Sequence, residues 1–217
     1  MKILLDTADR QAIDSFTDHP LVGGITTNPT LLRRSGVRRN ELADFVGYAL
    51  TRGFTELHVQ VMSSTSDAML ADANTLLGFG DTHRLVIKIP VTHDGLRAAQ
   101  ALIREGVRVT LTAGYAAEQA LWAVRVGASY LAPYLGRLND NGENGLAVIA
   151  EMQAILEREG GATKLLVASV RSSSEVVALA KLGVGAVTLP PALLQAMLIN
   201  SRTDEAERNF LADAAAL

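Results

Sequence analysis

Eight short apolar runs alternate along this chain with longer segments of helical period, and this alternation is the feature that most constrains the fold. The runs are rich in Val, Ile and Leu and are almost continuously apolar. Such runs are typical of strands buried on both faces of a parallel sheet. They cover residues 2–6, 23–27, 57–61, 84–91, 107–112, 129–133, 164–169 and 185–189.

The segments between these runs carry apolar residues three and four positions apart, which predicts amphipathic helices. Start and stop signals support two of them. Asp94 precedes a segment that stops at Gly106, and Ser172 precedes one that also stops at a glycine. The helical segments cover residues 8–17, 39–52, 66–77, 95–105, 115–127, 145–159, 172–182 and 190–197.

Strand–helix alternation repeated eight times predicts an α/β fold of the (β/α)8 TIM barrel type, with an extra C-terminal helix at about residues 203–216. The competing topology is a doubly wound open sheet, but no G-x-G-x-x-G motif follows any run. No linker interrupts the chain, so we expect residues 1–217 to form one barrel domain. The extra helix either caps the barrel or packs on a neighbouring subunit.

Composition narrows the classes of function. The net charge of −3, from 20 Lys and Arg against 23 Asp and Glu, provides no basic field for nucleic acid. The chain has no cysteine, which excludes disulfides and thiolate metal sites. No apolar stretch approaches the length needed to cross a membrane, and the N-terminal apolar run is too short for a signal peptide. We therefore expect a cytoplasmic protein without nucleic-acid or membrane partners.

Polar side chains lie at the carboxyl ends of seven of the eight expected strands. Active sites of (β/α)8 barrels lie at this end, so the pattern predicts a polar site there. Lys88 is the most informative residue, because it interrupts the most apolar run, LVIKIPV. A buried lysine loses hydration, its pKa falls, and the neutral amine can form a Schiff base with a carbonyl. The alternative is an edge-strand lysine that reaches solvent, but a closed barrel has no edge strand.

Other residues at these ends have structural alternatives. Asp6 either caps the following helix, a role that Thr7 could also fill, or pairs with Lys88. Gln60 lies inside an apolar run, and a buried amide needs partners for both of its ends. The histidines have no metal-ligand spacing, and we expect them at the surface or at strand ends. They are His58, His83 and His93.

Two arginines and a serine follow the sixth and seventh strands, and barrel phosphate sites tend to form late in the chain, near strands seven and eight. They are Arg137, Ser169 and Arg171. Each arginine taken alone is more simply a solvated surface charge. Together with the hydroxyl they can hold a phosphate by charge-assisted hydrogen bonds, so the group predicts an anion site.

The chain resembles the small transaldolase-like proteins, a group that includes the fructose-6-phosphate aldolases. The motifs span nearly the whole chain: LDTAD at 5–9, GITTNPT at 24–30, VQVM at 59–62, VIKIPVT at 86–92, TLTAGY at 110–115, APYLGRLND at 132–140 and VASVR at 167–171. The resemblance implies a barrel, a metal-free and cofactor-free Schiff-base mechanism on a sugar phosphate, and a ring-shaped homo-oligomer, a pentamer or decamer, whose C-terminal helices contact neighbours.

The resemblance also implies residue roles. Lys88 matches the Schiff-base lysine, and Asp6 matches the carboxylate that assists proton transfer. Gln60, Thr112 and Tyr134 match the residues that hold a catalytic water. The substrate-binding positions are matched by Thr26 and Asn28 at the dihydroxyacetone end, and by Arg137, Ser169 and Arg171 at the phosphate.

Two positions bear on the activity. Gln60 and Tyr134 form the aldolase-like pair, where transaldolases usually have Glu and Phe, whereas the loop after Tyr134 looks like that of the small transaldolases. We therefore expect an aldolase that cleaves or forms fructose 6-phosphate from dihydroxyacetone and glyceraldehyde 3-phosphate. The alternatives are a transaldolase that transfers a dihydroxyacetone unit, a related enzyme acting on a sulfonated sugar, and a non-catalytic barrel.

Overall fold

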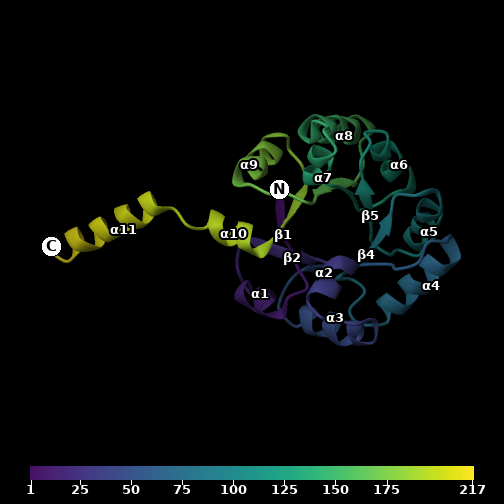
Figure 1. Cartoon of the computed structure of the whole chain (residues 1–217), viewed down its shortest axis with the longest axis horizontal. Coiled ribbons are helices and arrows are strands. Elements are labelled where there is room, and N and C mark those ends of the chain that lie inside the picture. Colours follow the sequence, from purple (N-terminus) through teal and green to yellow (C-terminus); the bar gives the residue numbers. More distant parts are fainter.

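A computed structural model describes residues 1–217 and contains a closed barrel of eight parallel strands in the order of the chain (Figure 1). The last strand pairs with the first, which closes the barrel. The eight-stranded barrel predicted from the alternation is confirmed. The strands are β1 (Lys2–Asp6), β2 (Val22–Thr26), β3 (Glu56–Gln60), β4 (Leu85–Pro90), β5 (Val109–Gly114), β6 (Tyr130–Pro133), β7 (Lys164–Val167) and β8 (Ala186–Leu189).

Helices surround the barrel, and two short ones lie where the sequence pattern predicted none. These are α2 and α7, each of six residues, which follow β2 and β6 directly. The segment predicted as one helix at 39–52 is a 3-10 turn, η1, followed by α3. The helical elements are α1 (Arg10–Ser15), α2 (Pro29–Arg34), η1 (Arg39–Glu41), α3 (Leu42–Leu50), α4 (Ser66–Leu77), α5 (His93–Arg104), α6 (Gln119–Val126), α7 (Leu135–Asp140), α8 (Gly145–Glu159), α9 (Ser173–Lys181), α10 (Pro191–Met197) and α11 (Ser201–Ala214).

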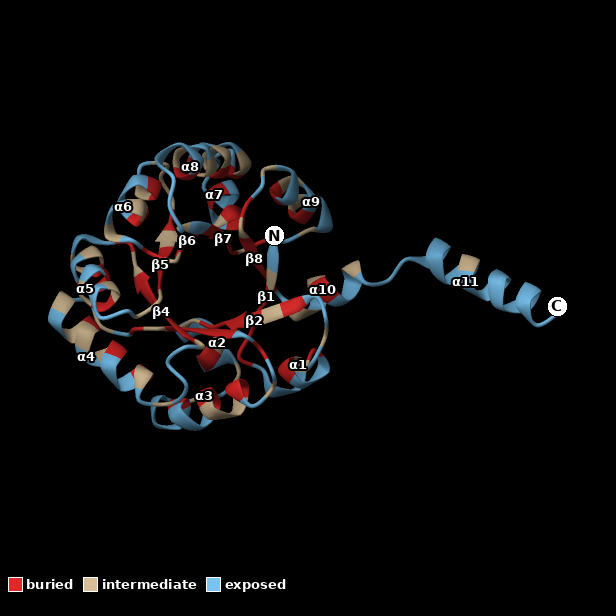
Figure 2. Ribbon diagram, turned by 180° about the vertical axis from the view of Figure 1, so that it is seen from behind, coloured by how far each residue is buried: buried red, intermediate tan, exposed pale blue.

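The strands direct alternate residues to opposite sides of the barrel wall. Leu5 and Ile87 belong to a cluster of 45 buried residues between the strands and the helices. Leu4 and Val86, one position earlier, belong to a separate cluster of six residues. Figure 2 shows the buried residues concentrated in the strands and on the helix faces turned toward them. Burying each large aliphatic side chain contributes about 1.5–3 kcal/mol, so both faces of the wall stabilise the barrel.

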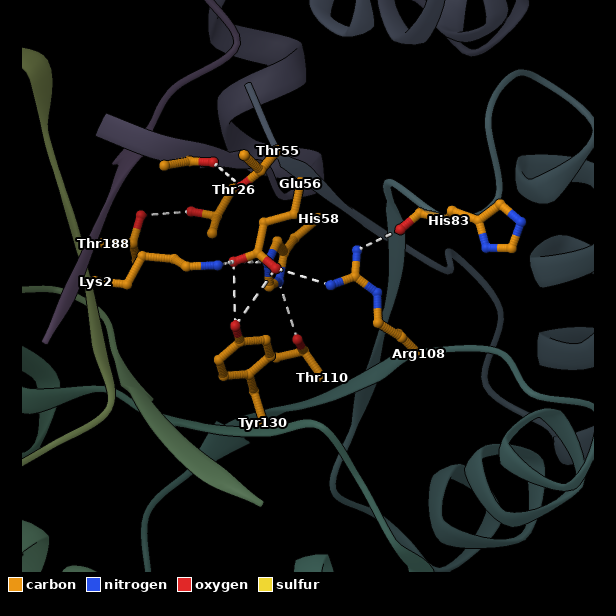
Figure 3. Close-up of polar contacts among 11 residues, drawn as sticks. Lys2, Thr26, Thr55, Glu56, His58, His83, Arg108, Thr110, Tyr130 and Thr188 are labelled. Carbon is orange, nitrogen blue, oxygen red and sulfur yellow. Dashed lines mark hydrogen bonds and ion pairs between the residues drawn. The ribbon is translucent and has the colours of Figure 1, made fainter. Parts of the chain in front are cut away.

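A charged cluster lies inside the barrel toward the amino ends of the strands (Figure 3). The Glu56 carboxylate is 1% exposed and accepts hydrogen bonds from Lys2 Nζ at 3.0 Å, Arg108 Nη1 at 3.0 Å and Tyr130 Oη at 3.1 Å. Burial alone raises the pKa of Glu56, but the neighbouring imidazole of His58 and the Lys2 ammonium outweigh it and lower this pKa to about 2. The cluster fills this end of the barrel interior with paired charges.

His58 belongs to the barrel interior, so its expected place at the surface or a strand end is wrong. Its side chain is fully buried, and Nδ1 lies 3.0 Å from Thr110 Oγ1. His58 lies two positions before Gln60 on β3, and residues two apart on a strand face the same side. This alternation of side chains could have predicted that His58 lies inside the barrel, once Gln60 was assigned to the inward face of β3. His83 and His93 are exposed, as expected.

The last helix, α11, extends away from the barrel (Figures 1 and 2). It confirms the helix expected at about 203–216, and it contains no buried residue. It therefore does not cap the barrel, which was one of its two expected placements. No helix in the structure has the length and apolar character needed to span a bilayer.

Candidate active site

The carboxyl ends of the strands surround a cavity of about 620 Å³, which is within the usual range for small-molecule sites. Nine of the ten residues predicted for the site line it: Asp6, Asn28, Gln60, Lys88, Thr112, Tyr134, Arg137, Ser169 and Arg171. The tenth, Thr26, is fully buried beside Asp6. Side chains from seven different strands or strand ends are thus brought to one cavity by the barrel closure.

Lys88 lies on β4 and points into this cavity. Its neighbours across the wall are Gln60 on β3 and Thr110 on β5, so β4 is not an edge strand and the alternative of a lysine reaching solvent at an edge is wrong. Lys88 is only 4% exposed, and its Nζ donates a hydrogen bond of 2.8 Å to the carbonyl oxygen of Thr27. Desolvation lowers the pKa of Lys88, and the Asp6 carboxylate opposes this effect. The environment therefore favours a neutral amine.

Asp6 ends β1 and is held by a threonine pair. Its Oδ1 accepts a hydrogen bond of 2.7 Å from Thr26 Oγ1, which also lies 2.7 Å from Thr188 Oγ1. Burial raises the pKa of Asp6, and the charge of Lys88 counteracts that rise. The net effect is a raised pKa, so this carboxyl group keeps its proton to a higher pH than an exposed aspartate does.

The helix cap predicted at Asp6 or Thr7 is wrong, because Asp9 takes that role. Asp9 Oδ1 accepts a hydrogen bond of 2.8 Å from the amide of Ala12 in the first turn of α1. Thr7 Oγ1 instead accepts from the amide of Asp9 at 3.1 Å. The cap lies two or three residues later than expected, and the carboxylate of Asp6 lines the cavity instead of capping the helix.

Three polar groups line the cavity from β3, from β5 and from the residue after β6. Thr112 Oγ1 lies 2.8 Å from Tyr134 Oη, and the Tyr134 ring packs edge-on against Tyr115 with 5.7 Å between centroids. Gln60 Oε1 is buried and has no hydrogen-bond partner. A buried amide oxygen without a partner is costly, so this position suits a polar ligand or a water molecule. Desolvation raises the pKa of Tyr134, which keeps its hydroxyl protonated at neutral pH.

The three residues predicted to hold an anion, Arg137, Ser169 and Arg171, follow β6 and β7 and line the cavity. The Arg137 guanidinium lies 4.8 Å from the centroid of the Tyr134 ring. Arg171 forms two hydrogen bonds with the Asp140 carboxylate, at 2.7 and 2.6 Å, so its charge is partly neutralised. Sequence reasoning missed Asp140, since nothing in the pattern shows that α7 begins immediately after Tyr134. Arg137 forms no such carboxylate pair and carries the freer charge.

The backbone at this wall is strained. Ser169 has a φ of +58° and Ala113 a φ of +62°, a region that side-chain-bearing residues rarely adopt. Each such residue costs on the order of 1–3 kcal/mol, and such residues cluster at functional sites. Gly136 allows α7 to approach, because a Cβ there would lie 2.6 Å from Ser169 O. Ser169 lines the cavity together with the two arginines.

The cavity lining also includes residues that sequence reasoning did not single out. Thr30, Leu31 and Arg34 line it from α2, and the short length of that helix concealed them. Thr188 contacts Thr26 and lies on the inward side of β8, two residues before Pro190. The alternation of side chains along a strand could have identified it. No group of three or more His, Cys, Asp or Glu side chains is placed to hold a metal ion together.

Fold and site together define a (β/α)8 barrel with a buried lysine and a carboxylate at the catalytic end. The model of the transaldolase/fructose-6-phosphate aldolase family matches residues 3–217, and the chain belongs to that family. Proteins named probable transaldolase are similar over most of their length. The one from Brucella ovis is 38% identical over 213 residues, 98% of this chain and 96% of its own. The one from Nitrosopumilus maritimus is 37% identical over 215 residues, 98% of this chain and 94% of its own. The chain is thus an enzyme of the aldolase or transaldolase type.

Solved structures with a similar fold are far more distant in sequence. A point mutant of flavocytochrome b2 matches 88% of this chain with a TM-score of 0.61 and 14% identity. A mandelate oxidase mutant matches 88% with a TM-score of 0.58 and 17% identity. The matched regions are 56% and 64% of those two chains. At these identities the likeness shows the barrel fold alone.

Proposed function

We propose that the chain is a Schiff-base aldolase that cleaves fructose 6-phosphate to dihydroxyacetone and glyceraldehyde 3-phosphate, and that it catalyses the reverse addition. The observation that carries this proposal is the Lys88 amine, which is 4% exposed and lies in a polar cavity with Asp6. Desolvation lowers its pKa, so a larger share of the amine is neutral and nucleophilic at neutral pH.

In the proposed reaction, Lys88 Nζ attacks the ketone carbon and water leaves, which forms an iminium ion. The bond between carbons three and four breaks, its electron pair moves into the iminium, and the hydroxyl proton on carbon four passes to a base. Asp6, whose pKa burial raises, is the group placed to take and return protons. The aldehyde phosphate leaves, the resulting enamine takes a proton, and water hydrolyses the imine to release dihydroxyacetone.

Gln60, Thr112 and Tyr134 would hold the water that takes part in these proton transfers. The unpartnered Gln60 oxygen and the paired hydroxyls of Thr112 and Tyr134 support that role. Arg137, Ser169 and Arg171 would bind the phosphate, since they line one wall with two guanidinium groups and a hydroxyl. Thr26 would act through the Asp6 carboxylate, and Asn28 would contact the three-carbon unit.

The second candidate is a transaldolase, which passes the three-carbon unit to an aldehyde such as erythrose 4-phosphate. The names of the similar proteins favour it. The Tyr134 hydroxyl, 2.8 Å from Thr112 Oγ1, favours the aldolase because proton delivery to the enamine releases the product before an acceptor arrives. A sulfonated sugar is a third candidate substrate, since guanidinium groups bind sulfonate and phosphate alike.

The deciding experiment measures cleavage of fructose 6-phosphate with and without erythrose 4-phosphate. We expect free dihydroxyacetone at a comparable rate in both samples. Product formation only when the acceptor is present would show a transaldolase and overturn the proposal. A parallel assay with a sulfonated ketose of the same length separates the third candidate, which would turn over the sulfonate in preference to the phosphate.

We also propose that the chain forms a homo-oligomer, a pentamer or decamer, through α11. This helix has 14 residues and none of them is buried, and Phe210 is 71% exposed. Isolated helices of this length are marginally stable in water, so α11 needs a packing partner. A second copy of the chain would provide this packing partner, and the exposed apolar side chains of Phe210 and Leu211 would form the contact.

A further inference from the structure

Arg34 lines the active-site cavity, and the reaction proposed above leaves it without a role. It is the last residue of α2 and has an exposed side chain. It takes part in none of the ion pairs of the chain. Its neighbour Arg33 is also exposed but does not line the cavity. One of two adjacent arginines is therefore directed to the site and the other to solvent.

Arg34 and Arg137 line the cavity from opposite sides of the barrel. In a closed barrel of eight strands, β2 and β6 are four steps apart and lie on opposite sides. Arg34 lies on α2, which follows β2, and Arg137 lies on α7, which follows β6. Figure 1 shows α2 and α7 on opposite sides of the barrel opening. The proposed phosphate-binding residues, which follow β6 and β7, thus lie on a different part of the rim from Arg34.

The charges around the cavity leave Arg34 without compensation. The lining contains three arginines, Arg34, Arg137 and Arg171, and one acidic side chain, Asp6. Asp6 interacts electrostatically with Lys88, since each affects the pKa of the other, so its charge does not compensate that of Arg34. Arg171 is paired with Asp140. A cavity of positive sign in a chain of net charge −3 attracts anions, and Arg34 is a free guanidinium on the side where no anion is yet assigned.

We propose that Arg34 is a second anion-binding group and that the cavity binds acyclic sugars carrying a phosphate at each end. One phosphate would lie against Arg137, Ser169 and Arg171, and the other would accept hydrogen bonds from the Arg34 guanidinium. A sugar with one phosphate reaches only one of these places at a time. This inference rests on the proposed function for the assignment of the first phosphate wall, and it makes no use of the Schiff base.

The test uses hexitol phosphates, which have no carbonyl group and cannot form an imine. Affinities for glucitol 6-phosphate and glucitol 1,6-bisphosphate are measured by calorimetry at low ionic strength, because salt screens exposed charges. The wild-type protein should bind the bisphosphate about fivefold more tightly than the monophosphate. Arg34→Ala should reduce this ratio to about two or less, and Arg34→Lys should restore part of it. Arg33→Ala is the matched control and should keep the wild-type ratio.

Three results would overturn the inference: equal affinities in the wild-type protein, an unchanged ratio in Arg34→Ala, or an equal loss in Arg33→Ala. The last result would show a general effect of rim charge. The borohydride experiment at the end of the Discussion tests the Schiff base independently. A protein that passes the hexitol test and fails the borohydride test would retain two anion sites but lose the proposed reaction.

Discussion

The amine of Lys88 donates a hydrogen bond of 2.8 Å to the backbone carbonyl of Thr27, so the loop after β2 holds the nitrogen that the proposed reaction uses. Thr27 is itself hydrogen-bonded to β3. Its amide and its Oγ1 both donate to the carbonyl oxygen of His58, each at 3.0 Å. The carbonyl that orients the Lys88 amine is therefore fixed by two hydrogen bonds to a neighbouring strand.

Replacing the Thr27 hydroxyl should weaken the attachment of Thr27 to β3. Thr27→Val keeps the shape but loses one hydrogen bond of the pair, which corresponds to a loss of about three- to tenfold in kcat. Thr27→Ser retains the hydroxyl and should recover most of the rate. Steady-state kinetics would show the loss in kcat with little change in KM. Equal rates for the valine and serine variants would contradict a positioning role for this hydroxyl.

The pH dependence of imine formation should report the pKa of Lys88. Burial lowers this pKa from its ordinary value of 10.5, whereas the Asp6 charge raises it. The rate of borohydride trapping in the wild-type protein should therefore reach half its maximum below pH 10.5. In Asp6→Asn the raising effect is lost, so the half-maximal pH should fall further.

Turnover in Asp6→Asn should fall by about 10²–10⁴, because a proton-transfer group is lost. Measurement of trapping and turnover on the same samples separates the two effects. A half-maximal pH that moves upward in Asp6→Asn would show that the Asp6 carboxylate does not favour the protonated amine. The conservative Asp6→Glu variant should return the trapping profile toward that of the wild-type protein.

The Tyr134 hydroxyl should control the partition between release and transfer. Tyr134→Phe removes the group that lies 2.8 Å from Thr112 Oγ1 and so weakens proton delivery to the enamine. The ratio of free dihydroxyacetone to transferred product should fall, which a coupled assay with erythrose 4-phosphate measures. Tyr115→Phe removes the other hydroxyl near Arg137 and serves as the control. A higher ratio in Tyr134→Phe would contradict the assigned role.

Glu56 should stabilise the barrel at neutral pH and lose this effect in acid. Its pKa in the folded protein is about 2, below the ordinary value of 4.5. A lowered pKa means that its stabilisation is complete above pH 4.5 and disappears as the pH falls toward 2. Glu56→Gln should lower the free energy of unfolding at pH 7 by about 2–3 kcal/mol.

Urea denaturation at a series of pH values would test the Glu56 prediction. The difference between the wild-type and Glu56→Gln proteins should shrink between pH 4.5 and pH 2. Glu159→Gln is a useful control, since its partner Arg125 lies on the surface with a side chain that is 78% exposed. Surface pairs contribute at most about 1 kcal/mol, so this variant should change little. A constant difference down to pH 2 would contradict the linkage.

The oligomer should depend on the apolar face of α11. Phe210→Asp places a charge where a neighbouring copy is proposed to pack and should reduce the mass measured by light scattering. Glu205→Ala changes an exposed polar residue of the same helix and should leave the mass unchanged. A monomeric wild-type protein, or an assembly that survives Phe210→Asp, would contradict the proposed role of α11.

The eight strands and most helices were predictable from the sequence, whereas the short helices α2 and α7 were not. The eight strands follow from apolar runs that any buried parallel barrel requires. The six-residue helices α2 and α7 span fewer than two turns, so their apolar residues form no recognisable period. Since α2 carries Arg34 and α7 carries Asp140, a charge that lines the cavity and the carboxylate that pairs with Arg171 both escaped notice.

Within the site, Lys88 could be predicted because a lysine inside an apolar strand has few structural explanations. Glu56 could not be predicted in the same way, since a polar residue at the start of a short strand is common. Its burial depends on the long-range closure that brings Lys2 and Tyr130 to the same place from distant strands. The cap at Asp9 was missed because Asp6, Thr7 and Asp9 are all residue types that cap helices well.

The most direct test of the central claim is borohydride reduction in the presence of dihydroxyacetone, followed by mass spectrometry of the digested protein. The account predicts a reduced three-carbon adduct on the peptide that contains Lys88 and no adduct in Lys88→Ala. Lys164→Ala, which removes an exposed lysine, should be trapped like the wild-type protein. The absence of an adduct in the wild-type protein, or an unchanged adduct in Lys88→Ala, would contradict a Schiff base at Lys88.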